Sequence, residues 1–171
     1  MPKTIELVVS LKVPDATSIT ALQTLHKIGF NKIKNIARSD YYKFLINGDV
    51  EKFKEKICKV DILVNVNKHL FAFKIKKNAT SEMSERELRY RSLSHVTGCV
   101  FFVLVKNIND DGSSILSTLK NRLGFFNIKN VEKSTLWSLT IDADENSAKK
   151  IAEKAARELL VNENYQEYVI L

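Results

Sequence analysis

The segment Gly29-Phe30-Asn31-Lys32-Ile33-Lys34-Asn35 recurs 95 residues later as Gly124-Phe125-Phe126-Asn127-Ile128-Lys129-Asn130. Gly, Phe, Ile, Lys and Asn occupy the same five positions in both copies. An amphipathic run precedes each copy, and a strand-like run follows it, at 42–46 in one and 137–141 in the other. Because these flanking patterns keep the same order, the repeat indicates an internal duplication of a small unit that pairs with its twin.

Hydrophobic periodicity predicts one order of elements for both copies: strand, helix, strand, strand, helix, strand. In the first copy they span residues 4–12, 17–28, 33–38, 41–46, 50–60 and 70–75. In the second they span residues 100–106, a helix that begins at Ser113 or Ser114 and ends at Gly124, 128–132, 136–141, a helix from Asp144 or Asn146 to Leu160, and 165–171. In that last helix we predict a buried stripe of Ile151, Ala155 and Leu159. In the strand before it, the inward set is Trp137, Leu139 and Ile141.

This order is the split β-α-β pattern of a ferredoxin-like unit, an antiparallel sheet with both helices on one face. The predicted fold is therefore α+β, with two tandem ferredoxin-like (βαββαβ) units whose antiparallel sheets pack as a pseudo-dimer. Units of about 75 residues have marginal cores on their own, so we expect the two to share buried surface. We predict units at residues 1–77 and 99–171, joined by a polar linker at 78–98.

Within the linker, Ser84 and Glu87 have the spacing of a capping box, and Leu88 and Leu93 follow them. This pattern is compatible with a short helix. The alternative interpretation is a solvated connection that spans the two units.

The chain is basic, with 27 Lys and Arg against 20 Asp and Glu and a net charge of +7. The excess lies in the first copy, since residues 1–78 hold 15 basic and 7 acidic groups and residues 99–171 hold 9 and 10. A basic half can bind nucleic acid or an acidic protein face, or it can simply keep a small domain soluble. No segment resembles a signal peptide or a membrane span, so we expect a cytoplasmic protein with no membrane contact.

The sequence offers little for catalysis. His26, His69 and His95 are far apart and lack metal-ligand spacing, and Cys58 and Cys99 are interpreted as small buried hydrophobes. There is no Gly-rich phosphate loop and no nucleophile elbow. We therefore predict no catalytic residues, no metal and no cofactor, and a binding or scaffolding subunit in place of a self-sufficient enzyme.

The end of the chain carries a more specific pattern. Arg157-Glu158-Leu159-Leu160-Val161-Asn162, followed by Tyr165-Gln166-Glu167-Tyr168, is similar to the closing signature of the PurS family. These proteins are small subunits of phosphoribosylformylglycinamidine (FGAM) synthase, a purine-biosynthesis enzyme. The family's two leucines, asparagine and tyrosine correspond to Leu159, Leu160, Asn162 and Tyr168.

Other parts of both copies resemble the same family. The helix that ends in Leu-Gly-Phe corresponds to Leu123-Gly124-Phe125 and, in the first copy, to Ile28-Gly29-Phe30. The lysine and first loop of the family resemble Lys106, Asp110 or Asp111, and Gly112, while Leu63, Asn65 and Phe71 echo the closing signature. The chain departs from the family pattern at Ser39-Asp40, Ser134-Thr135 and Glu163, and in a shortened first loop, Val13-Pro14-Asp15.

The resemblance implies two tandem PurS-type units, which makes the chain look like a covalently fused version of the family's homodimer. It further implies a subunit without catalytic residues or cofactor. That subunit joins an ATP-dependent synthetase (PurL-type) to a glutaminase (PurQ-type) for ammonia transfer, and it could self-associate further. On this interpretation no nucleic acid is bound.

Two alternatives remain open. The first is a pair of RNA-binding ferredoxin-like domains, prompted by the basic first copy and by Tyr42 and Phe44 on a predicted strand, although the glycines of the usual RNA-binding motif are missing. The second is a small-molecule sensor that binds its ligand between two such domains, for which no ligand loop is recognisable.

Overall fold

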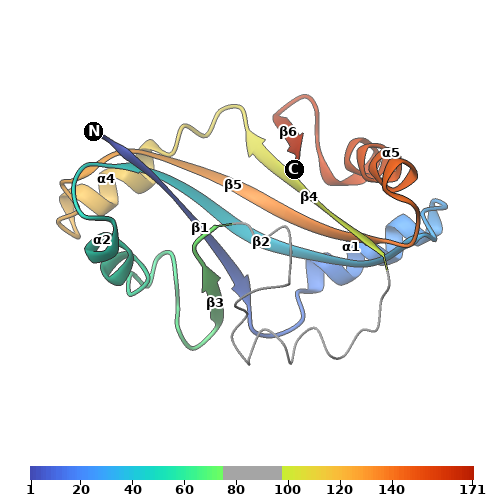
Figure 1. Ribbon diagram of the computed structural model, residues 1–171, viewed down its shortest axis with the longest axis horizontal. Helices are drawn as coiled ribbons and strands as arrows, with labels where there is room; N and C mark the ends of the chain where they lie inside the picture. Colours follow the sequence, from blue (N-terminus) through green and yellow to red (C-terminus); the bar gives the residue numbers. More distant parts are fainter. Residues whose placement is uncertain (75–97) are drawn as a thin grey trace.

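The computed structural model describes residues 1–74 and 98–171. Its elements are β1 (Lys3–Leu11), α1 (Ala16–Lys27), β2 (Ile33–Ile46), α2 (Val50–Ile57), β3 (His69–Ala72), β4 (Cys99–Asn107), α4 (Ser113–Asn121), β5 (Ile128–Ile141), α5 (Glu145–Ala155), a π-helical turn η1 (Ala156–Leu160) and β6 (Gln166–Ile170). The strands form one antiparallel sheet in the order β3-β1-β2-β5-β4-β6 (Figure 1). The α+β class and the antiparallel arrangement are confirmed. The predicted linker, with its capping box and His95, lies almost wholly outside the described residues.

Aspartates begin three of the described helices. The carboxylates of Asp15, Asp49 and Asp144 accept hydrogen bonds from backbone N–H groups in the first turns of α1, α2 and α5, as expected of N-cap residues. At α4 the N-cap is Gly112, with φ of 73° and no side-chain bond, so the helix begins at Ser113 without a serine cap. No helix in the described ranges is long and apolar enough to cross a membrane.

The two middle strands predicted for each unit are in fact one long strand. β2 runs unbroken through 33–46 and β5 through 128–141, so the predicted breaks near Ser39-Asp40 and Ser134-Thr135 are wrong. Neither position holds the Gly or Pro that would favour a turn. Pairing supplies the physical reason: β2 and β5 hydrogen-bond to each other along their whole length, which satisfies both backbones through the polar middle.

The two halves have the same strand register. β1 starts with Lys3 opposite Ile46 of β2, and β4 starts with Cys99 opposite Ile141 of β5, which is Ile46 shifted by the repeat. Where β2 meets β5, Asp40 lies opposite its own counterpart, Thr135, so a pseudo-two-fold axis passes between them. The two register shifts of this pair fall where Lys34 and its counterpart Lys129 lie.

The four α-helices of the described residues pack on one face of this sheet, in two clusters that each combine both halves of the chain. One cluster joins α1 and α5 over β4 and one end of the β2–β5 pair; the other joins α2 and α4 over β1 and the opposite end. Figure 1 shows these helix pairs at opposite ends of the sheet. Buried surface is thus shared between the halves, and the unit boundaries at 77 and 99 stay a prediction.

Between the clusters the helical face is polar. Along β2 the buried residues Ile36 and Tyr42 are separated by Arg38 and Asp40, which are exposed. We call this central strip the waist. Tyr42 and Phe44, the rings that prompted the RNA-binding hypothesis, are buried in the α2–α4 cluster. They serve the core and are not available to stack bases.

Candidate functional site

The two asparagines of the repeated signature form the same hydrogen-bonded turn. The carbonyl of Asn65 accepts from the backbone N–H groups of Lys68 and His69, and its side-chain oxygen accepts from the N–H of Asn67. Asn162 repeats these bonds with the residues 97 positions later: Tyr165, Gln166 and Asn164. The N–H groups of both asparagines also donate to side chains, to Nδ1 of His69 at 3.1 Å and to Oε1 of Gln166 at 2.9 Å. Each turn leads its helix into the edge strand β3 or β6.

The leucines next to these turns differ from the prediction. Leu63 and Leu160 are buried, but Leu159 is 36% exposed. The predicted stripe of Ile151, Ala155 and Leu159 is therefore wrong at its last residue. The cause is η1, in which the N–H of Val161 donates to the carbonyl of Ala156, five residues back. The wider π-turn rotates Leu159 outward and Leu160 into the core.

Tyr168 lies at the edge of the α1–α5 cluster and anchors the end of the chain. Its hydroxyl accepts from Nε of Arg157 at 2.9 Å, and this hydrogen bond is the main cause of the raised pKa of Arg157. Phe71 has the corresponding place in the first half, on β3, where its ring packs edge-on against Phe73.

Gly29 and Gly124 end α1 and α4 as predicted, with φ of 105° and 73°. The phenylalanine after each glycine turns back to its helix, since Phe30 N–H donates to Leu25 and Phe125 N–H donates to Leu119. Phe30 belongs to the α1–α5 cluster, and Phe125 packs against the α2–α4 cluster. These two Gly-Phe loops therefore lie at opposite ends of the sheet and do not form one site.

Lys106 and Gly112 lie around the loop that leads into α4. Nζ of Lys106 is 3.6 Å from a carboxylate oxygen of Glu132. A Cβ on Gly112 would lie 2.0 Å from the carbonyl oxygen of Val131, so only glycine fits this close backbone approach. Asp110 and Asp111 support the loop by accepting backbone N–H bonds two residues on.

In the first half the shortened loop, Val13-Pro14-Asp15, places Asp15 beside Arg38 of the waist. Oδ2 of Asp15 accepts from Ser18 Oγ at 2.8 Å and lies 3.1 Å from Nε of Arg38. Burial by itself raises the pKa of Asp15, but the Ser18 hydrogen bond and the Arg38 charge outweigh it and lower the pKa. A cavity of about 100 Å³ lies here, and its lining includes Asp15, Arg38, Asp40 and His69. It is large enough only for a small polar group.

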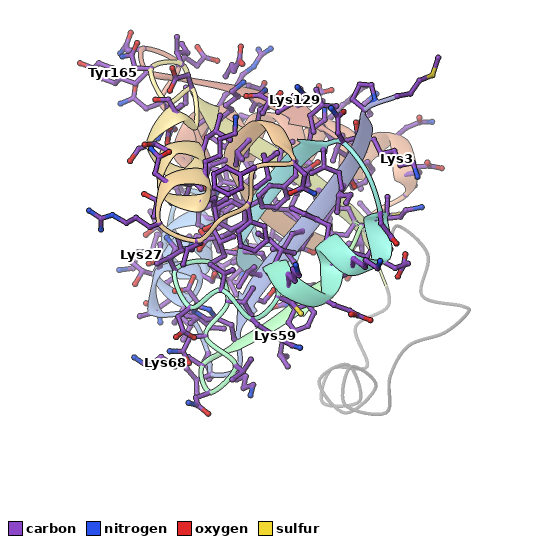
Figure 2. All side chains as sticks on the ribbon, turned by 90° about the vertical axis from the view of Figure 1, so that its left-hand side faces the viewer. Lys3, Lys27, Lys59, Lys68, Lys129 and Tyr165 are labelled. Atoms are coloured by element: carbon purple, nitrogen blue, oxygen red, sulfur yellow. The ribbon has the colours of Figure 1, made fainter. Side chains whose placement is uncertain are left out.

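A larger cavity lies between α2 and the second Gly-Phe loop, at the end of the sheet viewed in Figure 2. Its volume is about 240 Å³, and its lining residues are Asp49, Lys52, Phe53, Lys56, Leu123, Gly124, Phe125 and Asn127. Only Gly124 and Phe125 of these were predicted as site residues. The one signal for the rest is a difference between the repeats: Phe126 stands where the first copy has Asn31.

The predicted site residues thus form two equivalent sets of turn and loop residues. Within the described part of the chain, these two sets do not meet in a single catalytic cluster. Cys58 and Cys99 are half-buried; the prediction that they are buried is wrong. His26 is on the exposed side of α1, as expected, and its Nε2 lies 2.7 Å from the carbonyl oxygen of Ile33. The arrangement is suited to holding surfaces in place for binding.

Residues 101–171 match the model of a family named PurS and described as phosphoribosylformylglycinamidine (FGAM) synthase. This range begins in β4 and includes the second Gly-Phe loop, η1 and the Asn162 turn. No curated protein matches the chain.

Proposed function

We propose that this chain, which belongs to the PurS family through residues 101–171, is a non-catalytic small subunit of FGAM synthase and works in the cytoplasm. The observation that carries the proposal is the family match over β4 to β6. The catalytic groups would then lie on other subunits, a PurL-type synthetase that uses ATP and a PurQ-type glutaminase.

The first half would act as a second PurS-type unit, with boundaries at residues 1–77 and 99–171. The equal strand registers and the repeated turns at Asn65 and Asn162 support this interpretation. A fused pair fixes one pseudo-two-fold arrangement in a single chain, so pairing of the halves does not depend on protein concentration.

Bridging has a clear chemical use. Ammonia released by a glutaminase is largely protonated in neutral water and diffuses away, and the ammonium ion is not a nucleophile. A subunit that aligns the ammonia source with an activated formylglycinamide ribonucleotide raises the local concentration of ammonia at the second site. The rigid six-stranded sheet, with helix pairs at both ends, offers two separated surfaces for such a role.

The test is reconstitution. Amidine formation from glutamine is measured with the synthetase and glutaminase subunits of the same organism, with and without this chain. We expect glutamine-dependent activity to require the chain, and activity with added ammonium chloride to need only the synthetase. Unchanged glutamine-dependent activity, together with no complex by size-exclusion chromatography with light scattering, would overturn the proposal. The same light-scattering experiment on the chain alone measures its self-association.

A further inference from the structure

We propose that the cavity between α2 and the second Gly-Phe loop binds an acidic segment of a partner subunit, which inserts an apolar side chain between Phe53 and Leu123. This inference rests on the proposed function, because it assigns one of the bridging contacts to a place on this chain.

The size of the cavity favours a protein segment over a metabolite. Its volume of about 240 Å³ is below the range of about 300–1,000 Å³ that is usual for small-molecule pockets. Such a space accommodates one large apolar side chain from a partner.

Two aromatic rings in the lining of the cavity, Phe53 and Phe125, are held in place. Phe53 is 2% exposed, and its ring packs edge-on against Phe44 at 5.4 Å and against Phe125 at 5.9 Å between centroids. Because these rings are locked by the core, the cavity exists before a partner arrives and little ordering entropy opposes binding.

Apolar side chains beside the cavity face solvent. Leu123 lines it and is 45% exposed, and Phe126 in the same loop is 78% exposed. Large aromatic side chains are among the residues that dominate binding energy at interfaces. The folded core does not need this ring, because the equivalent loop of the first half has Asn31 in its place.

The charge at the cavity selects an acidic partner. Lys52 and Lys56 lie one helical turn apart on α2, and neither forms an ion pair within the described part of the chain. The carboxylate of Asp49 is engaged by the backbone N–H groups of Glu51 and Lys52. Lys3, Lys59 and Lys129, which are labelled in Figure 2, are exposed at the same end of the molecule. Complementary charge of this kind steers association and rejects basic partners.

The other Gly-Phe loop lacks the exposed ring, although Ile28, the counterpart of Leu123, is 48% exposed there. Phe30 is only 9% exposed, and Nζ of Lys154 lies 5.8 Å from the centroid of its ring. An exposed aromatic ring close to the two cavity lysines of α2, which have no described ion pair, is therefore found at the α2–α4 end. The proposed contact is made once per chain, although the framework is repeated.

The experiment measures the affinity of the full chain for the synthetase and glutaminase subunits by isothermal titration calorimetry. Phe126→Asn, which restores the first-copy residue, and the double variant Lys52→Glu/Lys56→Glu should each weaken binding to one subunit about tenfold or more. The matched control, Lys149→Glu/Lys150→Glu on α5, makes the same change in net charge at the opposite end and should leave the affinity for that same subunit unchanged. All the substituted side chains are exposed, and thermal melting by circular dichroism verifies folding.

The outcomes separate the two proposals. If wild type binds and both cavity variants bind equally well, this inference is wrong while the proposed function stands. If wild type binds neither subunit, the proposed function fails, and a fluorescent acidic peptide with a single Phe becomes the probe. Binding of that peptide to wild type but not to Lys52→Glu/Lys56→Glu would support a site for an acidic segment of a different partner protein. If the peptide does not bind to wild type, the proposed acidic-segment site is overturned.

Discussion

On the face of the sheet opposite the helices, the first half carries Thr4, Glu6 and Val8 where the second half carries Val100, Phe102 and Leu104. The matching registers make these positions equivalent. Partners on the neighbouring strands change in the same sense, because Glu6 pairs with Lys43 and Phe102 pairs with Ser138. At the position of Glu6 the first half is thus charged where the second half has Phe102.

The two Gly-Phe loops differ in a comparable way, with Asn31 in one and Phe126 in the other. The backbone turns and buried contacts that hold both halves together are alike, whereas their surfaces are not. A homodimer must present the same surface twice. A fused pair is free of that constraint, so each half can adapt to a different neighbour while the framework is kept.

The largest expected effect tests the shared core. Leu160→Asp places a carboxylate in the α1–α5 cluster and should destabilise the protein by about 4 kcal/mol or more. Since α1 belongs to the first half, both halves should unfold in one transition and complex formation should be lost. Leu159→Asp, at the exposed neighbour, should change the free energy of unfolding by less than about 1 kcal/mol. Urea denaturation followed by circular dichroism measures both, and wild-type assembly by Leu160→Asp would contradict the shared core.

A second prediction uses a glycine that only one half requires. Gly112→Ala combines a positive φ with a Cβ 2.0 Å from the Val131 carbonyl oxygen, so we expect a loss of about 3 kcal/mol or more. Gly29→Ala has the positive φ but no atom within 4 Å of the new Cβ, and should lose about 1–2 kcal/mol. The comparison is made by urea denaturation, and equal losses would show that the close approach at Gly112 is relaxed at little cost.

Alkaline pH should destabilise the protein through two buried tyrosines of the first half, Tyr41 and Tyr42. Burial, reinforced by the charge of Asp40, raises the pKa of Tyr42 to about 12 from the ordinary value near 10; burial and Glu6 likewise raise the pKa of Tyr41. Their counterparts in the second half, Leu136 and Trp137, do not titrate. A raised folded-state pKa means that this stability is complete below pH 10 and is lost as the pH rises toward 12.

The alkaline loss attributable to Tyr42 should approach about 2 kcal/mol at pH 12. Denaturation midpoints measured from pH 8 to 11.5 should fall less steeply for Tyr42→Phe than for wild type. Parallel curves for the two proteins would show that Tyr42 ionises as readily in the folded state as in the unfolded one.

The smallest effect tests the equivalence of the halves. Asn65→Ala and Asn162→Ala each remove a side-chain oxygen that accepts one backbone N–H, at 3.0 Å and 3.1 Å. Each should cost about 1 kcal/mol, and the two losses should agree within about 0.5 kcal/mol. If urea denaturation shows a clearly larger loss of unfolding free energy at one site, the two turns contribute unequally to the stability of the fold.

Local chemistry accounts for the features that could be predicted from the sequence. Gly29 and Gly124 end helices because glycine tolerates positive φ, and Trp137, Leu139 and Ile141 are buried because side chains alternate along a strand. The turns at Asn65 and Asn162 make equivalent hydrogen bonds, and Leu63 and Leu160 are both buried.

Features that depend on distant partners could not be predicted in this way. The continuity of β2 and β5 through polar residues is decided by their pairing with each other. The exposure of Leu159 depends on a π-turn, which has no sequence signal in the periodicity of α5. The cavity beside Phe53 forms because α2 of one half packs next to a loop of the other half. No sequence pattern within either segment predicts this contact.

The sequence by itself therefore determined the α+β class, the repeated turns and the order of elements apart from the breaks predicted within β2 and β5, because these features follow from propensities and contacts within a few residues. Only the tertiary structure decided that α1 shares a core with α5 and α2 with α4, and that the two halves complete a single sheet. Those choices are made by hydrophobic surfaces and strand edges, which are satisfied equally well by many partners until the whole chain has closed on itself.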